Sequence, residues 1–233
     1  MQYTGARALL QTAFLLCLCE LISRPTQADS PRDQPVPAAA PLPVPALGPA
    51  HAAVPTPNFH YVDATWDREV RVLPAVTPGP RVLVYLHGYC GDINAVGAFV
   101  PAAAAHGTLI ALLGDQPCKD KPGRFKWSND IRGLDARIQR AIRLVNRTQG
   151  LRLDPHDVTL FGYSQGAARA ESLTRYYGGH YPRVILGGPP RRPQAPHFKG
   201  TQSVAVFGGE KEDTHDMIGG ADDLAAAGIR ARF

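Results

Sequence analysis

The sequence lacks any strong cluster of like charges, and this absence argues against a nucleic-acid partner. Its 233 residues carry 25 lysines and arginines against 20 aspartates and glutamates, a net charge of +5 that is spread along the chain. Only residues 131–147 gather arginines, opposite a helical apolar pattern, which is typical of a solvated helix face. An anionic partner for that face is the alternative. We predict no nucleic-acid partner and interpret the excess charge as a contribution to solubility.

Cysteine is also scarce, and no metal site is expected. The chain contains four cysteines, at positions 17, 19, 90 and 118, and no Cys/His cluster has the spacing of metal ligands. There is no internal repeat either. A chain of this length is long enough for one sizeable α/β domain. We therefore expect a single folded domain that uses neither a metal ion nor another cofactor.

The first 28 residues have the pattern of a secretory signal peptide. Arg7 precedes a mostly apolar stretch over residues 8–22, and residues 26–28 form a plausible small-residue cleavage site. The apolar stretch is interrupted by polar residues and is too short to span a bilayer comfortably. A cleaved signal peptide is therefore the first interpretation, and a membrane anchor is the second. We predict a protein that is secreted or located in the periplasm or cell envelope, without a stable membrane span after signal removal.

Residues 29–58 are rich in proline and alanine and are predicted to be a disordered, extended linker. The folded domain is then expected to span residues 59–233. Within it, buried apolar runs alternate with helical patterns. Strands are expected at 60–64, 68–73, 81–86, 108–113, 158–161, 183–186, 203–207 and 229–233. Helices are expected at 96–105, 131–147, 167–177 and 221–227. This alternation predicts an α/β fold with a doubly wound, mostly parallel sheet covered by helices on both faces.

One short motif carries most of the chemistry. Gly162, Ser164 and Gly166 form the pattern G-x-S-x-G between a predicted strand and a predicted helix. In that setting the pattern indicates a nucleophile elbow, a strained turn that lifts a serine hydroxyl above the sheet. Glycines on both sides allow neighbouring chain to pass closely. The alternative is a glycine-flanked turn whose serine only faces solvent.

Together with a strand that ends in His87-Gly88, the G-x-S-x-G motif makes residues 59–233 resemble the α/β-hydrolase family. The chain is most similar to its compact branch of esterases, dienelactone hydrolases and secreted depolymerases. This resemblance implies a secreted serine hydrolase that cleaves a small-molecule or polymeric ester, and less readily a peptide. It implies an oxyanion hole built from the backbone N–H groups of Tyr89 and Gln165. His87 is then expected to shape the oxyanion loop, because the family places its catalytic histidine last.

The resemblance also places a catalytic acid in the loop after the strand at 203–207. That loop has four acidic candidates, and the glycine-then-acid pattern of the family favours Asp213, with Glu212 as the alternative. A purely structural role is equally open, because an acidic side chain there would cap the following helix.

The catalytic histidine of the family is expected after the last strand. That strand ends with the sequence at Phe233, and no histidine follows it. Two explanations are open: the domain is truncated, which we favour, or another residue supplies the base. His215 is the best internal substitute, although a weak one. A hydrolase-fold protein that binds a ligand without catalysis is therefore the alternative function.

Cys90 and Cys118 follow two strands that we expect to be neighbours in the sheet. In the oxidising compartment implied by a signal peptide, a disulfide between them is the expected state. It would connect the oxyanion loop to the loop at 114–129. The alternative is a free, reactive thiol at Cys90.

Overall fold

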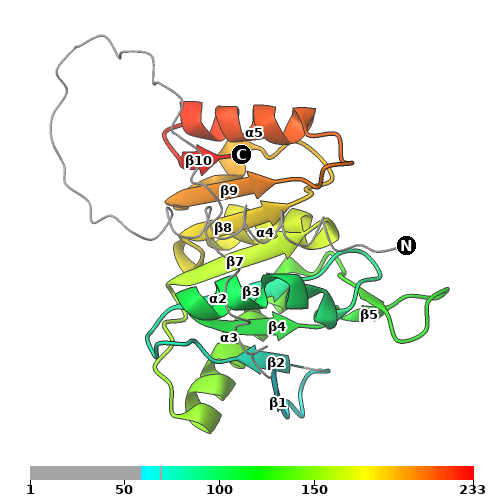
Figure 1. Cartoon of the computed structure of the whole chain (residues 1–233), viewed down its shortest axis with the longest axis vertical. Coiled ribbons are helices and arrows are strands. Elements are labelled where there is room, and N and C mark those ends of the chain that lie inside the picture. Colours follow the sequence, from blue (N-terminus) through cyan, green and yellow to red (C-terminus); the bar gives the residue numbers. More distant parts are fainter. Residues whose placement is uncertain (1–58, 69) are drawn as a thin grey trace, which may run out of the picture.

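The computed structural model describes residues 59–68 and 70–233, so the predicted signal peptide and linker lie outside the described residues. Among the described residues, eight strands form one sheet in the order β1-β2-β4-β3-β7-β8-β9-β10 (Figure 1). Their bounds are β1 (His60–Val62), β2 (Val70–Leu73), β3 (Val82–Leu86), β4 (Thr108–Leu112), β7 (Val158–Tyr163), β8 (Arg183–Gly187), β9 (Ser203–Phe207) and β10 (Arg230–Arg232).

Most of the sheet is parallel, as the sequence predicts. β1 and β2 are antiparallel to their neighbours, while every pair from β4 to β10 is parallel. Every residue of β3, β4 and β9 is buried, which is the expected property of strands covered on both faces. The carboxyl ends of β3, β7, β8 and β9 therefore meet at one edge of the sheet.

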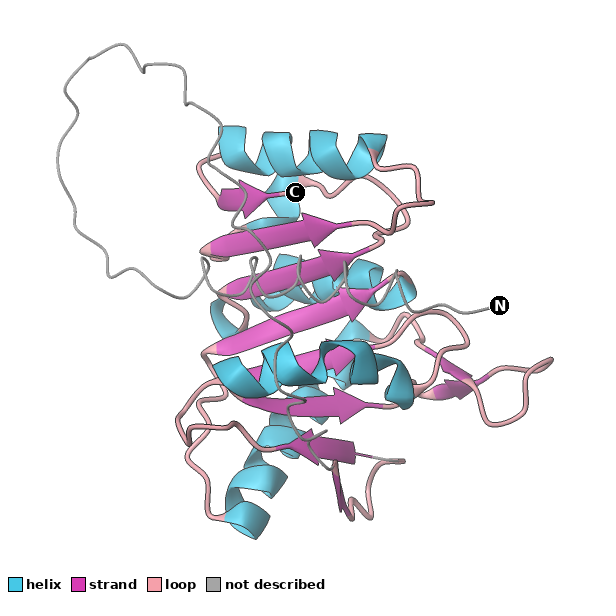
Figure 2. Ribbon diagram, in the orientation of Figure 1, coloured by secondary structure: helices cyan, strands magenta, loops and turns pink. Residues whose placement is uncertain are grey.

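Helices cover both faces of the sheet (Figure 2). The 3-10 helix η1 (Ile93–Phe99) and α2 (Val100–His106) pack with one face in one core cluster. α3 (Ile131–Gln149), α4 (Gln165–Tyr177) and α5 (His215–Ala226) pack with the other face in a second cluster. The buried side of α3 carries Leu134, Ile138, Ile142 and Val145, the spacing from which this helix was predicted.

Four regions differ from the sequence prediction. The loop at 114–129 contains a short hairpin of β5 (Gln116–Pro117) and β6 (Phe125–Lys126), which has no alternating apolar pattern to reveal it. α5 begins at residue 215 rather than 221, because two glycines in its first turns hide the helical pattern. Short 3-10 helices also form at η2 (Gly178–His180) and η3 (Ala195–Phe198), where the sequence analysis expects neither a helix nor a strand. None of the helices in the described part of the chain is both long and apolar enough to cross a membrane.

Candidate active site

Ser164 occupies a sharp turn between β7 and α4. Its backbone lies at φ 51° and ψ −114°, a conformation that is strained for a residue with a Cβ. Its N–H donates a hydrogen bond of 2.8 Å to the carbonyl oxygen of Gly187, at the end of the neighbouring strand β8. Strand, turn and helix thus follow one another as predicted, and the serine is partly exposed at the carboxyl edge of the sheet. Its role as a nucleophile stays a prediction at this point.

The two motif glycines are required by close backbone contacts. A Cβ at Gly162 would collide with the carbonyl group of Gly166, and a Cβ at Gly166 would collide with the carbonyl group of Leu86 at the end of β3. Any larger residue would push α4 away from the sheet. The glycines therefore allow the first turn of α4, and with it Ser164, to sit directly on the ends of β3 and β7.

A tight turn from Gly88 to Gly91 lies beside Ser164. The N–H of Gly91 donates to the carbonyl oxygen of Gly88 at 2.9 Å, and a Cβ built on Gly88 would lie 3.4 Å from the Cβ of Ser164. The backbone N–H groups of Tyr89 and Gln165 donate no hydrogen bond to another described residue. Both predicted oxyanion donors are thus unoccupied on segments that flank the serine.

A disulfide between Cys90 and Cys118 fixes this turn, with a Cα–Cα distance of 5.8 Å. The prediction of a disulfide is confirmed, and the alternative of a free thiol at Cys90 is wrong. Cys90 itself has a φ of 47°, and Gly91 pairs with Phe125 of β6. The turn beside Ser164 is therefore connected covalently and by backbone pairing to the β5–β6 hairpin.

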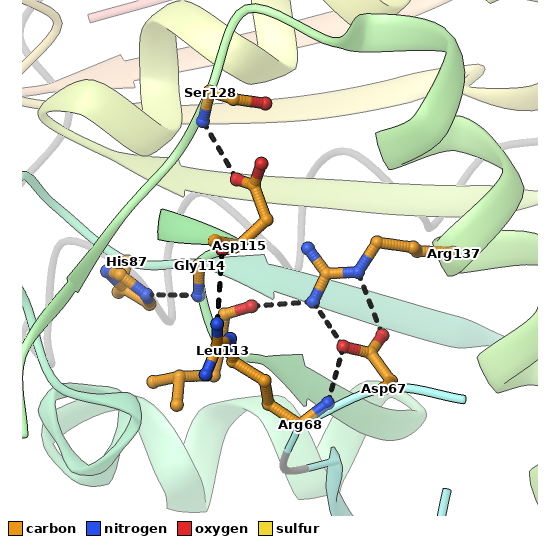
Figure 3. A network of polar contacts seen from close by, with 8 residues as sticks. All are labelled: Asp67, Arg68, His87, Leu113, Gly114, Asp115, Ser128 and Arg137. Atoms are coloured by element: carbon orange, nitrogen blue, oxygen red, sulfur yellow. Dashed lines mark hydrogen bonds and ion pairs between the residues drawn. The ribbon is translucent and has the colours of Figure 1, made fainter. Parts of the chain in front are cut away.

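His87 supports the same turn, and its side chain points to the backbone of Gly114 (Figure 3). Its ring is fully buried, and its Nε2 accepts a hydrogen bond of 2.8 Å from the N–H of Gly114. The Nδ1 atom lies 2.7 Å from the carbonyl oxygen of Gly88 and therefore carries the proton. Burial lowers the pKa of His87, which keeps the ring neutral. Both ring nitrogens are thus used to hold the backbone.

An ion pair fixes the end of β4 next to His87 (Figure 3). The guanidinium of Arg137 donates to both carboxylate oxygens of Asp67 at 2.7 and 2.8 Å, and also to the carbonyl oxygen of Leu113 at 2.7 Å. Asp115 accepts a hydrogen bond of 2.8 Å from the N–H of Ser128. The segment that meets His87 is therefore held from both sides.

The side chain of Gln165 has a role that the sequence analysis missed. Its Oε1 accepts from the N–H of Trp127 at 3.0 Å, and its Nε2 donates to the carbonyl oxygen of the same residue at 3.1 Å. The indole N–H of Trp127 donates to the carbonyl oxygen of His87 at 2.7 Å. Gln165 thus connects the first turn of α4 to the loop that supports the turn from Gly88 to Gly91. We call this segment the oxyanion turn, because it carries the predicted oxyanion donor Tyr89. The motif identified the backbone N–H of Gln165 but gave no signal for its side chain.

The two predicted acids point in different directions. Glu212 accepts a hydrogen bond of 3.2 Å from the hydroxyl group of Tyr163 and another of 2.8 Å from the N–H of Gly209. The Glu212 carboxylate also lies close to Gly188, so it is located over the ends of β7 and β8. Asp213 is exposed and accepts from the N–H of His215 at 3.0 Å, at the beginning of α5. The hydrogen bond to Tyr163 therefore favours Glu212, the alternative acid, whereas Asp213 accepts from the first residue of α5 and precedes the N-cap residue Thr214.

No histidine of the described residues is paired with either acid. His215 is exposed at the first position of α5, and only its backbone N–H contacts Asp213. Two histidines do contact carboxylates, but elsewhere: His180 lies 3.0 Å from Asp135, and His197 lies 2.8 Å from Glu171. The expected serine, histidine and acid are thus not assembled within residues 59–68 and 70–233. No group of three or more potential metal ligands occurs in that part either.

Comparison with known proteins supports the assignment of the fold. No family model and no curated protein matches the chain. Among solved structures, the chain is similar to a carboxylesterase from Bacillus cereus, with 17% identity and a TM-score of 0.50 over 70% of this chain and 82% of that one. It is also similar to an esterase from Rhizomucor miehei, with 14% identity and a TM-score of 0.51 over 75% and 72%. The chain has the α/β-hydrolase fold.

A third solved structure, of the protein TT1662 from Thermus thermophilus, is 16% identical, with a TM-score of 0.51 over 73% of this chain and 83% of the other. At these identities the likeness concerns the α/β-hydrolase fold alone. Function has to be argued from the site, because one fold hosts many chemistries.

Proposed function

We propose that this α/β-hydrolase-fold protein is a secreted serine hydrolase that cleaves carboxylic esters, with Ser164 as its nucleophile. The observation that carries the proposal is the strained serine at φ 51° between two unoccupied backbone N–H groups, those of Tyr89 and Gln165. Strain of this kind costs about 1–3 kcal/mol and persists where the surrounding structure enforces it, which is frequent at active sites.

In the proposed reaction, the Oγ atom of Ser164 forms a bond to the acyl carbon while a general base takes its proton. The carbonyl oxygen acquires negative charge and accepts hydrogen bonds from the two N–H groups. The bond to the alcohol then breaks, and the alcohol leaves with the proton from the base. Water repeats the sequence and releases the acid. No step needs a cofactor.

We propose Glu212 as the acid that orients the base, because its carboxylate contacts Tyr163, the residue before the nucleophile. His215 is the candidate base within the described residues, since it begins the helix that follows the Glu212 loop. Its ring would have to turn toward Glu212. Replacing His215 by alanine tests this role: if hydrolysis persists at the original rate, the base is another residue.

The substrate class follows from the same proposal. The solved structures of similar fold include proteins named carboxylesterase and esterase, which supports an ester of a small molecule. A polymeric ester is the extension that the sequence analysis predicted.

The experiment is hydrolysis of 4-nitrophenyl butyrate by the full chain. Ser164→Ala should reduce the rate by at least about 10³-fold, because nucleophile and base act as a unit. Thr148→Ala is a matched control, since it removes a hydroxyl group at the far end of α3. Equal rates for the original protein and Ser164→Ala would remove the proposal. Secretion is tested separately, by N-terminal sequencing of the exported protein, which should begin at Asp29.

A second candidate function is ligand binding without catalysis. It is favoured by one observation, that no histidine side chain among the described residues is paired with Glu212 or Asp213. A folded, secreted protein without measurable ester hydrolysis would support this alternative.

A further inference from the structure

A cavity of about 610 Å³ runs along α4. Its walls come from α4, from the start of α3, from the segment after β8 and from the first turn of α5. None of the steps proposed above uses it. Its volume is in the range of small-molecule sites.

Positive charge dominates the walls of this cavity. Four arginines line it, Arg169, Arg175, Arg191 and Arg192, against two carboxylates, Glu171 and Asp216. Arg175 and Arg191 are exposed and Arg169 and Arg192 are partly exposed, so their guanidinium groups keep access to solvent. The cavity therefore presents an excess of two positive charges to an anion that enters it.

The four arginines differ in whether they have an acidic partner. Arg192 is neutralised by Asp223, at 2.8 Å. Arg191 has no hydrogen bond or ion pair with any described residue, and the contact recorded for Arg175 is with the ring of Tyr176, at 5.4 Å. Two guanidinium groups in the cavity thus lack an acidic partner within the described chain.

Arg169 adds a third cation at the end of the cavity nearest to Ser164. Its guanidinium donates to neutral groups, the carbonyl oxygen of Ser128 and the amide oxygen of Asn129, each at 2.7 Å. Burial lowers the pKa of Arg169, Asp115 opposes that effect, and the charge of Arg191 adds to it. Arg169 and Arg191 therefore lie close enough to repel each other.

The two carboxylates of the cavity do not compensate for these three arginines. The Oε1 atom of Glu171 accepts from the N–H of Gln194 at 3.0 Å and lies 2.8 Å from Nδ1 of His197. Asp216 acts on Arg192, whose pKa it helps to raise after the larger effect of Asp223. Both acids are thus committed to other partners.

The position of the cavity connects it to the proposed active site. It shares Asn129 and Arg169 with a smaller cavity of about 270 Å³, which is lined by Tyr89 and Gln165, the two proposed oxyanion donors. Arg191 follows Gly187 by four residues, and Gly187 pairs with Tyr163 next to the nucleophile. The two cavities therefore share a wall, and a molecule that contacts the proposed oxyanion donors in the smaller cavity lies beside Arg169.

We propose that this cavity binds a carboxylate group carried by the ester substrate, held by Arg191, Arg175 and Arg169. Guanidinium groups match carboxylates in geometry and can donate two parallel hydrogen bonds to each. The proposal rests on the proposed ester hydrolysis for the identity of the ligand. The preferred substrates are then esters with a free acid group several bonds from the scissile bond, such as monoesters of dicarboxylic acids.

The first experiment measures binding and does not depend on catalysis. Sodium glutarate and sodium pentanoate are titrated into the full chain carrying Ser164→Ala, by calorimetry at low salt. Glutarate should bind, and pentanoate should bind more weakly. Arg191→Gln and Arg175→Gln should each weaken glutarate binding about tenfold or more, because each removes a charge-assisted hydrogen bond.

Arg143→Gln is the matched control, since it removes the same charge from an exposed position of α3 that does not line the cavity. It should leave glutarate binding unchanged. Equal effects of Arg143→Gln and Arg191→Gln, or no glutarate binding, would overturn the proposal. Inorganic phosphate is titrated in parallel. Phosphate binding that depends on Arg191, without glutarate binding, would mean a site for free phosphate and would also overturn it.

The second experiment compares the 4-nitrophenyl monoester of glutarate with 4-nitrophenyl pentanoate. The ratio of their kcat/KM values should favour the acidic ester and fall about tenfold in Arg191→Gln but not in Arg143→Gln. If neither ester is hydrolysed, the proposed function fails while the binding experiment still decides the cavity. If both are hydrolysed with a ratio that Arg191→Gln leaves unchanged, the cavity proposal alone fails.

Discussion

A serine in a left-handed conformation depends on its neighbours to stay there. Ser164 is held by the bond from its N–H to Gly187 and by the direct contacts of Gly162 and Gly166 with adjacent backbone. Its hydroxyl group is placed by these backbone contacts, without a hydrogen bond from its own side chain capping the helix. The conformation therefore serves the position of the side chain, which is the arrangement that a nucleophile requires.

Replacing the two acids separately tests which one belongs to the site. Glu212→Gln keeps the shape of the side chain but removes the charge that would stabilise a protonated base, so kcat should fall at least about tenfold. Asp213→Asn keeps an oxygen that can accept the hydrogen bond from the N–H of His215, so kcat and the free energy of unfolding should both stay nearly unchanged. Ester hydrolysis and urea unfolding are measured for both variants. A larger loss of kcat in Asp213→Asn would return the catalytic role to Asp213.

Sequence reasoning reached the loop of the acid but not the residue. Glu212 and Asp213 are adjacent, and the turn between Gly209 and α5 sends one carboxylate toward Tyr163 and the other to the helix start. Which neighbour points inward depends on the backbone angles of that turn, and residue types alone do not specify them. The hydrogen bonds between the Gln165 side chain and the backbone of Trp127 were also missed. The two residues are 38 positions apart, and residue types alone do not show that the fold brings them together.

Among the structural elements, the oxyanion turn is a short segment that contains neither a helix nor a strand and depends on its neighbours for its shape. The Gly88–Gly91 turn is held by the disulfide from Cys90 to Cys118 and by His87 underneath. Because the other half of the proposed oxyanion hole lies on α4, the two N–H groups stay aligned only while this turn is fixed. The disulfide thus supports the alignment that the proposed catalysis requires.

Reduction of the disulfide should therefore impair catalysis more than substrate binding. Loosening one oxyanion donor lowers kcat by up to about 10²–10³-fold, with a smaller change in KM. The measurement compares oxidised protein, protein treated with dithiothreitol and the double variant Cys90→Ser, Cys118→Ser. Reoxidation should restore the rate of the treated protein. Unchanged kcat in folded, reduced protein would show that the turn keeps its shape without the bond.

The elements themselves were predictable to different degrees. The long strands and α3 have strong apolar periodicity, and they were located within a few residues. The β5–β6 hairpin has two residues in each strand, and its stability comes from the disulfide and from pairing with Gly91 rather than from its own pattern. The early start of α5 depends on contacts with the sheet, which override the poor helix propensity of its glycines.

In the molecule as a whole, the network of Figure 3 connects the edge of the sheet that carries the proposed active site to buried His87, which affects the stability of the domain. Burial lowers the pKa of His87, whereas an unfolded histidine binds a proton near pH 6.5. Between these two pKa values the unfolded state binds more protons than the folded state. Stability is therefore fully present above about pH 6.5 and is lost as the pH falls below it.

We expect the free energy of unfolding, measured with urea, to decrease below pH 6.5 by up to about 1.4 kcal/mol per pH unit from His87 alone. His106 also has a pKa lowered by burial and by Arg81, so it contributes in the same direction. His87→Gln should reduce the slope, and His106→Gln should reduce it separately. A slope that is the same in the original protein and in His87→Gln would contradict the assigned role of His87.

The architecture of the molecule followed from the sequence better than its active site did. Buried runs that alternate with helices permit few arrangements, and right-handed crossovers produce a doubly wound sheet. The disulfide was predictable because β3 and β4 are neighbours, which brings Cys90 and Cys118 to the same edge. The arginine cavity was not predictable, since its walls come from four separate segments.

The most direct test of the account is covalent labelling of the full chain with a fluorophosphonate probe, followed by peptide mass spectrometry. The account predicts one adduct, on Ser164, which disappears in Ser164→Ala and slows when the disulfide is reduced, because the phosphonyl oxygen would use the same two N–H groups. Folded protein that stays unlabelled, or that carries the label at another residue, would contradict the claim that Ser164 is an activated nucleophile.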